Sequence, residues 1–192
     1  MKRVLQLLTC LSIIYCGCDG PYRNCPEHYF SESFMLHTSF HDGSYWIYCD
    51  TVYNVTDSIV LISQEIDYKE DCDYHGDPEQ ILTQSFYSSL FEPHQFLMDC
   101  RASNPVYYAD DVLGFFRDDL KIGESMWFTY EAKYDSLLVN DHWYKGVMVF
   151  TAGNDHKYFW AEKVGLIKKM FPAPDNSSIV YDFEIVRYKI NE

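Results

Sequence analysis

The sequence contains none of the short patterns that mark common catalytic or nucleotide-binding sites. It has no Gly-x-Ser-x-Gly elbow, no phosphate-binding loop and no dinucleotide fingerprint. Its seven histidines, at positions 28, 37, 41, 75, 94, 142 and 156, are scattered, and none of them belongs to the His-Glu-x-x-His motif of a helical zinc site. We therefore expect a non-enzymatic protein with no cofactor and no bound metal, and we interpret the histidines as exposed loop residues.

Basic residues are scarce, since 15 Lys and Arg stand against 29 Asp and Glu, which gives a net charge of −14 at pH 7. An acidic surface repels phosphate backbones and anionic lipid head groups. The balance therefore argues against nucleic-acid binding and against electrostatic attachment to a membrane. Low-complexity segments and helical heptads are also absent, so neither a repetitive tail nor a long helix is expected.

No apolar run is long enough to cross a bilayer as a helix. The run at Val4–Tyr15 contains only three polar residues and follows the basic pair Lys2-Arg3, an order that is typical of a secretory signal. The next residues, Gly17-Cys18, resemble a bacterial lipobox, in which a small residue precedes a cysteine that is acylated after cleavage. Ordinary cleavage after Gly17 or at Gly20 is the alternative.

These features divide the chain into a lipoprotein signal peptide at residues 1–17, a tether at residues 18–42 and an antiparallel β domain at residues 43–192. Several acyl chains on Cys18 would hold the protein firmly on a membrane, because each buried methylene contributes about 0.8 kcal/mol. We expect a membrane-anchored protein of the cell envelope that faces the periplasm or the cell surface, with the outer membrane as the preferred location. Within the tether, four residues are candidates to dock on the domain: Phe30, Phe34, Met35 and Leu36.

Removal of the signal peptide takes away two basic residues and leaves 13 basic against 29 acidic residues, a net charge of −16. Four cysteines then remain: Cys25, Cys49, Cys72 and Cys100. In an oxidising envelope an even number of cysteines indicates structural disulfides, and free thiols are the alternative. Three pairings are open, because sequence spacing does not choose among them.

Short runs of β-branched and aromatic residues, separated by turn residues, predict strands along most of the domain. The clearest runs are Tyr45–Tyr53, Ser58–Ile66, Tyr144–Phe150, His156–Ala161 and Val164–Phe171. Asn54–Asp57 is expected to form the turn between the first two runs, and Ser125–Lys133 and Tyr134–Asn140 are two further candidates. Near the C-terminus, Phe183 and Ile185 alternate with Asp182 and Glu184, which predicts an antiparallel strand with one wet face. Residues 81–91 fit either a strand or a helix. We expect a mainly β fold: a single curved antiparallel sheet or a partly open β-barrel of about 8–10 strands, with little helix.

Several stretches resemble cell-envelope lipoproteins of Bacteroidota that carry no assigned function. They are Gly43–Tyr48 (GSYWIY) followed by Asp57-Ser58-Ile59, then Tyr144–Phe150, Tyr158–Lys168 (YFWAEKVGLIK) and the terminal Val186-Arg187-Tyr188. The resemblance covers most of the mature chain, implies a curved antiparallel sheet and carries over no catalytic residues. Many members have a small residue and Gly where this chain has Glu162 and Lys163, which leaves the form of that turn open.

Members of that lineage attach glycans to Ser or Thr within Asp-Ser/Thr-apolar triplets. Thr51, Ser58 and Ser136 stand in such triplets, for which ordinary strand and turn composition is the alternative. The stretch Asp71–Asp77 gathers three carboxylates and a glycine, but it departs from the calcium-loop pattern, so we interpret it as a solvated acidic loop.

These observations favour a non-enzymatic binding or interaction module that is held on the envelope by its lipid. Its partner would be another envelope protein or a small apolar ligand. The alternative is a carrier of an apolar ligand or lipid, with Trp46, Tyr48, Phe159 and Trp160 lining an aromatic cavity, although a filled core is the simpler interpretation. A third hypothesis is an enzyme that uses carboxylates, and its candidates are Asp71, Asp73 and Glu131.

Overall fold

The computed structural model describes residues 25–70, 77–90, 94–109, 113–153, 156–173 and 176–191. Within these ranges the chain forms one short helix, α2 (Glu32–Thr38), and eleven strands. The strands are β1 (Tyr45–Asp50), β2 (Val55–Lys69), β3 (Glu79–Ser88), β4 (His94–Arg101), β5 (Tyr107–Ala109), β6 (Gly114–Phe116), β7 (Thr129–Val139), β8 (His142–Ala152), β9 (His156–Ala161), β10 (Gly165–Ala173) and β11 (Asn176–Lys189). The expected mainly β fold with little helix is confirmed.

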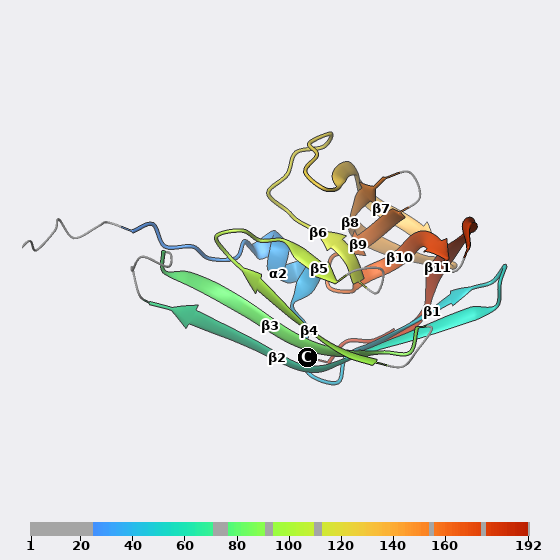
Figure 1. Ribbon diagram of the computed structural model, residues 1–192, viewed down its shortest axis with the longest axis horizontal. Coiled ribbons are helices and arrows are strands. Elements are labelled where there is room, and N and C mark those ends of the chain that lie inside the picture. Colours follow the sequence, from blue (N-terminus) through green and yellow to red (C-terminus); the bar gives the residue numbers. More distant parts are fainter. Residues whose placement is uncertain are drawn as a thin grey trace, which may run out of the picture.

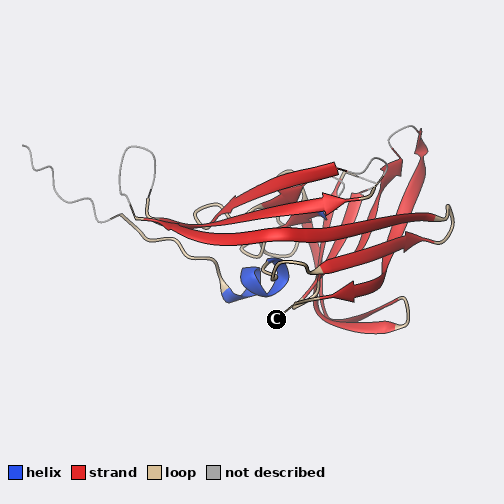
Figure 2. Cartoon of the chain, turned by 90° about the horizontal axis from the view of Figure 1, so that it is seen from below, coloured by secondary structure: helices blue, strands red, loops and turns tan. Residues whose placement is uncertain are grey.

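Nine strands form one antiparallel sheet in the order β4-β3-β2-β1-β11-β10-β9-β8-β7, and β5 pairs with β6 in a separate small hairpin. The sheet is strongly curved, and β2 and β3 extend beyond the other strands as a long arm (Figures 1 and 2). Among the described residues the two end strands, β4 and β7, do not pair with each other. The structure is therefore an open curved sheet of nine strands, within the predicted number.

The tight turns of the sheet use residues that tolerate a positive φ. Asn140 and Asp141 join β7 to β8 with φ values of 45° and 64°, which is the backbone of a two-residue type I′ hairpin. Between β1 and β2, the Asp50 carboxylate accepts hydrogen bonds from the backbone N–H groups of Val52 and Tyr53 at 2.8 and 2.9 Å. This turn covers residues 51–54, so Asp57 lies inside β2 rather than in the turn where the sequence had suggested it.

Alternation along the strands places one side of each in the core. In β11, Phe183 and Ile185 are buried, whereas Asp182 and Glu184 face outward toward Lys168, as the sequence pattern predicted. Residues 81–91 were open between strand and helix, and residues 81–88 belong to β3, with alternate side chains buried. The two runs predicted on either side of residue 134 are one continuous strand, β7.

The hollow of the sheet is filled by aromatic side chains from helix α2 and the β5–β6 hairpin. Phe34 of α2 contacts the rings of Tyr107 and Phe116, with centroids at 6.4 and 5.8 Å. These two rings in turn contact Trp160 of β9 at 5.2 and 5.3 Å. The helix and the hairpin therefore bridge the two ends of the curved sheet, which lie far apart in strand order.

Helix α2 lies inside the segment that the sequence analysis had assigned to the tether. Ser31 caps it, since its hydroxyl accepts a hydrogen bond from the backbone N–H of Phe34 at 2.9 Å, and Glu32 occupies the first turn. Phe34 is fully buried and Phe30 nearly so. From about residue 30 onward this segment is thus part of the folded body and forms one wall of the groove described below.

Candidate functional site

An open groove of about 970 Å³ lies beside helix α2. The residues that line it are Glu32, Met35, Leu36, Ser39, Phe40, His41, Lys163, Val164, Tyr188, Lys189, Ile190 and Asn191. They come from three segments: α2 with the residues after it, the β9–β10 turn, and the end of β11 with the residues that follow it. A second hollow of about 770 Å³ adjoins the groove and shares its lining from Phe40, His41 and residues 189–191.

Hydrogen bonds between these segments fix the walls of the groove. The backbone N–H of Lys163 donates to the carbonyl of Leu36 at 2.6 Å, which ties the β9–β10 turn to α2. The indole of Trp46 donates to the carbonyl of Val164, also at 2.6 Å. At the other wall, the backbone N–H of Asn191 donates to the Ser44 hydroxyl at 3.0 Å. The groove is therefore built on anchored backbone rather than on free loops.

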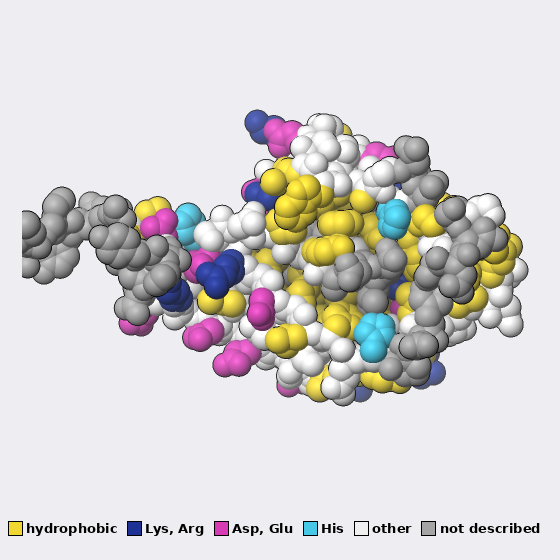
Figure 3. Space-filling model, viewed as in Figure 1, with side chains coloured by type: hydrophobic (Ala, Val, Ile, Leu, Met, Phe, Trp, Pro, Cys, Tyr) yellow, Lys and Arg dark blue, Asp and Glu magenta, His cyan; other side chains and the backbone are white. Residues whose placement is uncertain are grey.

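The groove combines an apolar lining with charged groups at its rim. Met35, Leu36, Val164 and Ile190 are half-buried in it, and the Tyr188 side chain is 41% exposed. An apolar hollow with a few polar groups at its rim is the usual anatomy of a small-ligand site. Over the molecule as a whole, Figure 3 shows apolar side chains gathered over the middle of one face and charged side chains along the arm.

The space between the aromatic side chains inside the curved sheet is far smaller than the groove. Trp46, Tyr48 and Trp160 line a cavity of only about 10 Å³, together with Phe86 and other core residues. A space of this size holds about one water molecule. Three of the four candidate cavity residues thus meet at one small void. The fourth, Phe159, lies at the alternate position of β9 on the other face, where the Lys157 ammonium is 5.6 Å from its ring.

A lysine and an aspartate form a fully buried ion pair within the same core. The Lys169 ammonium of β10 donates to the Asp57 carboxylate of β2 at 2.7 Å, and both side chains have 0% exposure. The other oxygen of Asp57 accepts from the Ser88 hydroxyl at 3.0 Å. The ammonium also lies over three aromatic rings, those of Tyr48, Phe183 and Phe171, at 5.0, 5.4 and 5.8 Å. The charges are therefore compensated and have no access to solvent.

Tyr48 stands next to this pair, directly opposite Asp57 in the β1–β2 pairing. Its hydroxyl donates to the carbonyl of Leu166 at 2.8 Å. Burial, and then the negative charge of Asp57, raise the pKa of Tyr48 well above its ordinary value. The phenol stays neutral, and its proton is committed to a backbone carbonyl. This arrangement suits a structural role better than proton transfer to a substrate.

The histidines were expected to be exposed loop residues, but His94, His142 and His156 begin strands β4, β8 and β9, and His28 and His156 are half-buried. His37 departs furthest from the expectation. It lies on α2 with 1% exposure and stacks on the Phe116 ring at 4.9 Å. Its Nε2 is 3.0 Å from the carbonyl oxygen of Gly146 in β8, and its Nδ1 is 2.7 Å from that of Ser33. The prediction was wrong here because the side chain follows Phe34 at helical spacing and completes the buried face of a helix that the sequence analysis had not recognised.

The cysteines are divided between buried and half-buried positions on separate strands. Cys49 and Cys100 are free thiols, on β1 and β4, so neither supports its predicted bridge. The strands that carry them are separated by β2 and β3. Burial raises the pKa of the Cys100 thiol to about 12, and the thiol donates to the carbonyl of Val106. No disulfide joins two described residues, although Cys25 is disulfide-bonded, and Cys72 lies outside the described ranges.

The structure distributes the other candidate residues over the surface. Thr51 and Ser136 are exposed and Ser58 is half-buried, whereas Asp57 of the Ser58 triplet is the buried partner of Lys169. Glu131 lies on β7 and pairs with Lys157 at 2.7 Å. The described residues contain no cluster of ligating side chains suited to a metal ion. Three further candidate positions fall outside those ranges: Cys18, Asp71 and Asp73.

No protein-family model, curated protein or solved structure matches this chain. Its likeness to envelope lipoproteins therefore stays a sequence-based expectation. Within the part of the chain that the structure describes, no helix has the length and apolar character needed to cross a membrane.

Sequence reasoning missed the groove and the buried pair for different reasons. The groove is assembled from segments near residues 35, 163 and 190, and nothing in the chain order brings these together. The inward position of Lys169 could have been predicted, because Lys169 and Phe171 are two residues apart in an apolar strand and therefore point to the same face of the sheet. The partner of Lys169 could not be predicted, since Asp57 was assigned to a turn.

Proposed function

We propose that this chain is a non-enzymatic binding module of the cell envelope, held on a membrane through lipid on Cys18, and that it binds its partner in the groove beside α2. One observation carries the proposal. The cavity that Trp46, Tyr48 and Trp160 line inside the curved sheet measures only about 10 Å³, while a groove of about 970 Å³ with an apolar lining opens at the surface. Binding sites of small ligands typically have volumes of about 300–1,000 Å³.

The alternative is a carrier that encloses an apolar ligand within the sheet. The side chains that would surround such a ligand, Trp46, Tyr48 and Trp160, already contact one another or the β5–β6 hairpin. Admission of a ligand would require the hairpin to leave. The geometry therefore favours binding at the surface groove over enclosure in the core.

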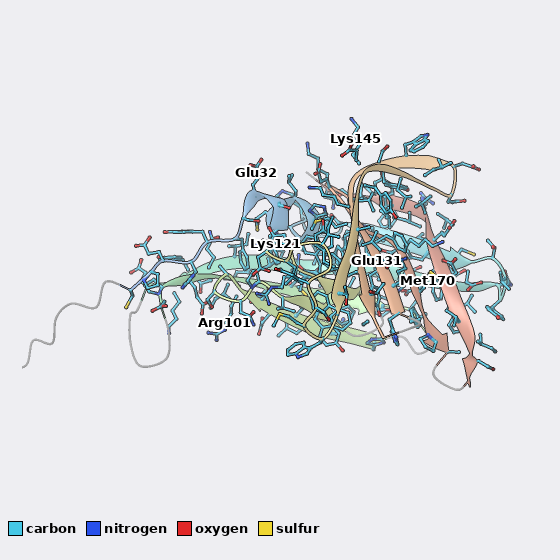
Figure 4. All side chains as sticks on the ribbon, turned by 90° about the horizontal axis from the view of Figure 1, so that it is seen from above. Glu32, Arg101, Lys121, Glu131, Lys145 and Met170 are labelled. Carbon is cyan, nitrogen blue, oxygen red and sulfur yellow. The ribbon has the colours of Figure 1, made fainter. Side chains whose placement is uncertain are left out.

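Site-specific photocrosslinking in cells that produce the full chain tests the binding site. A photoreactive amino acid replaces Met35, which lines the groove, or Lys145, which points outward from β8 (Figure 4). We expect an adduct at position 35 and none at position 145. Native mass spectrometry of the purified protein adds a second measurement. A small ligand that stays bound when Met35 is replaced by Asp would support the carrier and contradict the groove.

The anchor has a separate test. Cells fed a labelled fatty acid should label the chain, and Cys18→Ala should abolish the label while leaving the folded domain intact. Label that persists in the Cys18→Ala variant would exclude the lipid at this position. Disulfide bonding of Cys25 accords with an oxidising compartment of this kind.

A further inference from the structure

The groove beside α2 carries an electrostatic feature that its apolar lining does not explain. Two lysines, Lys163 and Lys189, stand at its rim with one carboxylate, that of Glu32. Neither lysine has an ion-pair partner among the described residues. Among the residues that line the groove itself, two ammonium groups stand against one carboxylate, and a second carboxylate, that of Asp42, lines the adjoining hollow. The groove lining is thus locally basic, although the chain as a whole has a net charge of −14.

Some lysines elsewhere in the sheet are paired with carboxylates, whereas Lys121, Lys133 and Lys145, like the two rim lysines, have no ion pair among the described residues. Lys157 pairs with Glu131 at 2.7 Å, and Lys168 pairs with Asp182 and Glu184 at 2.9 and 2.8 Å. Acidic residues outnumber basic ones almost two to one, so partners are plentiful. What sets Lys163 and Lys189 apart from the other unpaired lysines is their position, because both line one apolar hollow, where a negatively charged ligand would lie near both ammonium groups.

Lys163 is also held in a backbone conformation that lysine rarely adopts. Its φ is 61°, in the left-handed region, and its N–H is fixed by the carbonyl of Leu36. Strained non-glycine residues of this kind concentrate at functional sites, where the surrounding structure holds them in place. The hydrogen bond to Leu36 fixes this turn, so the Lys163 side chain starts from a fixed backbone position at the edge of the groove.

The apolar part of the groove defines the rest of the ligand. Met35 and Leu36 form one wall, Tyr188 and Ile190 the other, and Val164 lies at the turn between them. Phe40 lies beneath with 4% exposure and packs edge-on against Trp46 at 5.0 Å. An occupant that matches this surface has an apolar body and a single negatively charged end, and the volume of the groove suits a small molecule rather than a folded partner.

We propose that the groove binds a single-chain amphiphile with an anionic head, of which a long-chain carboxylate is the simplest example. Its chain lies along Met35, Leu36, Val164 and Ile190, and its head lies between the Lys163 and Lys189 ammonium groups. This inference rests on the proposed function, because it names the class of ligand for the same groove.

Photolabelling of the full chain in membranes tests the inference. The probe is a fatty acid that carries a diazirine in its chain, and the comparison probe is an amine with the same chain and diazirine. Labelled peptides are mapped by mass spectrometry, and each yield is normalised to peptides outside the groove. We expect the acid to label the peptides that contain residues 35–36, 164 and 188–190 more strongly than the amine does. The double variant Lys163→Ala/Lys189→Ala should lower that labelling about tenfold, the effect of one lost charge-assisted hydrogen bond.

The matched control removes two lysines elsewhere. Lys133 and Lys145 are exposed on β7 and β8 and do not line the groove, so Lys133→Ala/Lys145→Ala should leave the labelling unchanged. Equal labelling of the groove by the acid and the amine would overturn the anionic class while leaving the groove as a binding site. Absence of labelling by either probe at the groove would overturn the inference, whereas the proposed function would be overturned separately, by the absence of an adduct at position 35 in the crosslinking experiment.

Discussion

Strand β10 carries two adjacent lysines that point to opposite faces of the sheet. Lys169 faces the interior, where it is fully buried and lies 2.7 Å from the carboxylate of Asp57. Lys168 faces outward, where its ammonium contacts Asp182 and Glu184 at 2.9 and 2.8 Å. The bond lengths are nearly the same, but the surroundings differ, because the two carboxylates beside Lys168 are 41% and 38% exposed.

The comparison shows that the length of an ion pair does not set its contribution to stability. Outside, water replaces a lost partner, and the surviving charge stays solvated. Inside, a lost partner leaves a charge that water cannot reach. For Lys168, burial lowers the pKa, but hydrogen bonds to Glu184 and Asp182 more than offset this effect and raise it above its ordinary value. Lys168 therefore stays charged, and the response to breaking each pair is what distinguishes the two lysines.

The largest effect is expected from breaking the interior pair. Lys169→Met keeps most of the side-chain volume but leaves the Asp57 carboxylate buried without its cation. We expect the free energy of unfolding to fall by about 3–5 kcal/mol, measured by urea denaturation. The loss of ammonium contacts with three aromatic rings acts in the same direction.

A double variant separates the two causes of that loss. Lys169→Met/Asp57→Leu removes both charges, and replacing a whole buried pair by apolar groups is often close to neutral. We expect most of the stability to return, although the Ser88 hydroxyl then lacks its acceptor. A double variant as unstable as Lys169→Met alone would show that packing, and not the uncompensated charge, dominates.

Glu79 sharpens the comparison because its ion pair is buried on one side only. Its side chain is 4% exposed, whereas that of its partner Arg101 is 57% exposed. Burial raises the pKa of the Glu79 carboxyl, but hydrogen bonds from Ser103 and then from Arg101 outweigh it, so the pKa lies below its ordinary value. Stability from this group is complete above the unfolded pKa of about 4.3 and is lost as the pH falls through the lower folded value.

Glu79→Gln should therefore cost about 1–3 kcal/mol at pH 7, the cost of weakening hydrogen bonds to a buried charged group. The difference between the variant and the natural protein should shrink as the pH falls below about 4.3. Urea denaturation between pH 3 and pH 7 measures it. A difference that stays constant over this range would show that the charge of Glu79 contributes nothing beyond its shape.

A smaller effect is expected from the outer lysine of β10. Lys168→Ala should lower the free energy of unfolding by about 1 kcal/mol or less, because exposed ion pairs contribute little. High salt should reduce the effect further, since the Debye length falls to about 3 Å at 1 M ionic strength. The Lys169→Met effect should be insensitive to salt. A loss as large as that of Lys169→Met would contradict the distinction between the two faces.

Much of the sheet was predictable from the sequence, because strands and hairpins follow local alternation and turn chemistry. The β8–β9–β10 meander and the β1–β2 hairpin were expected within a few residues of their observed bounds. Register was harder to infer. A bulge between Leu166 and Lys168 shifts the pairing of β10 with β9, so both Leu166 and Ile167 are buried. No local pattern marks such a bulge, and alternation alone would have placed one of these two residues in solvent.

The candidate site was less predictable than the sheet because its parts come from distant segments. Helix α2 has only seven residues, and its signals are a serine cap and the spacing of Phe34, His37 and Thr38. In a segment with prolines and no longer periodicity these signals were not recognised. Without the helix, residues 35 and 36 had no reason to meet residue 190, and the two rim lysines had no reason to be considered together.

Lys163 differs from both lysines of β10, because we expect its side chain to contribute to ligand binding rather than to the stability of the fold. Its left-handed backbone costs a non-glycine residue roughly 1–2 kcal/mol. Lys163→Gly removes this strain but adds flexibility to the unfolded chain, which costs roughly 0.5–1 kcal/mol. We expect the free energy of unfolding to change by less than about 1 kcal/mol, toward greater stability, while labelling of the groove by the anionic probe falls. Lys163→Ala serves as the control, since it loses the charge, keeps the strained backbone and should gain no stability. A clear loss of stability in Lys163→Gly, with labelling unchanged, would make Lys163 a structural residue like Lys169.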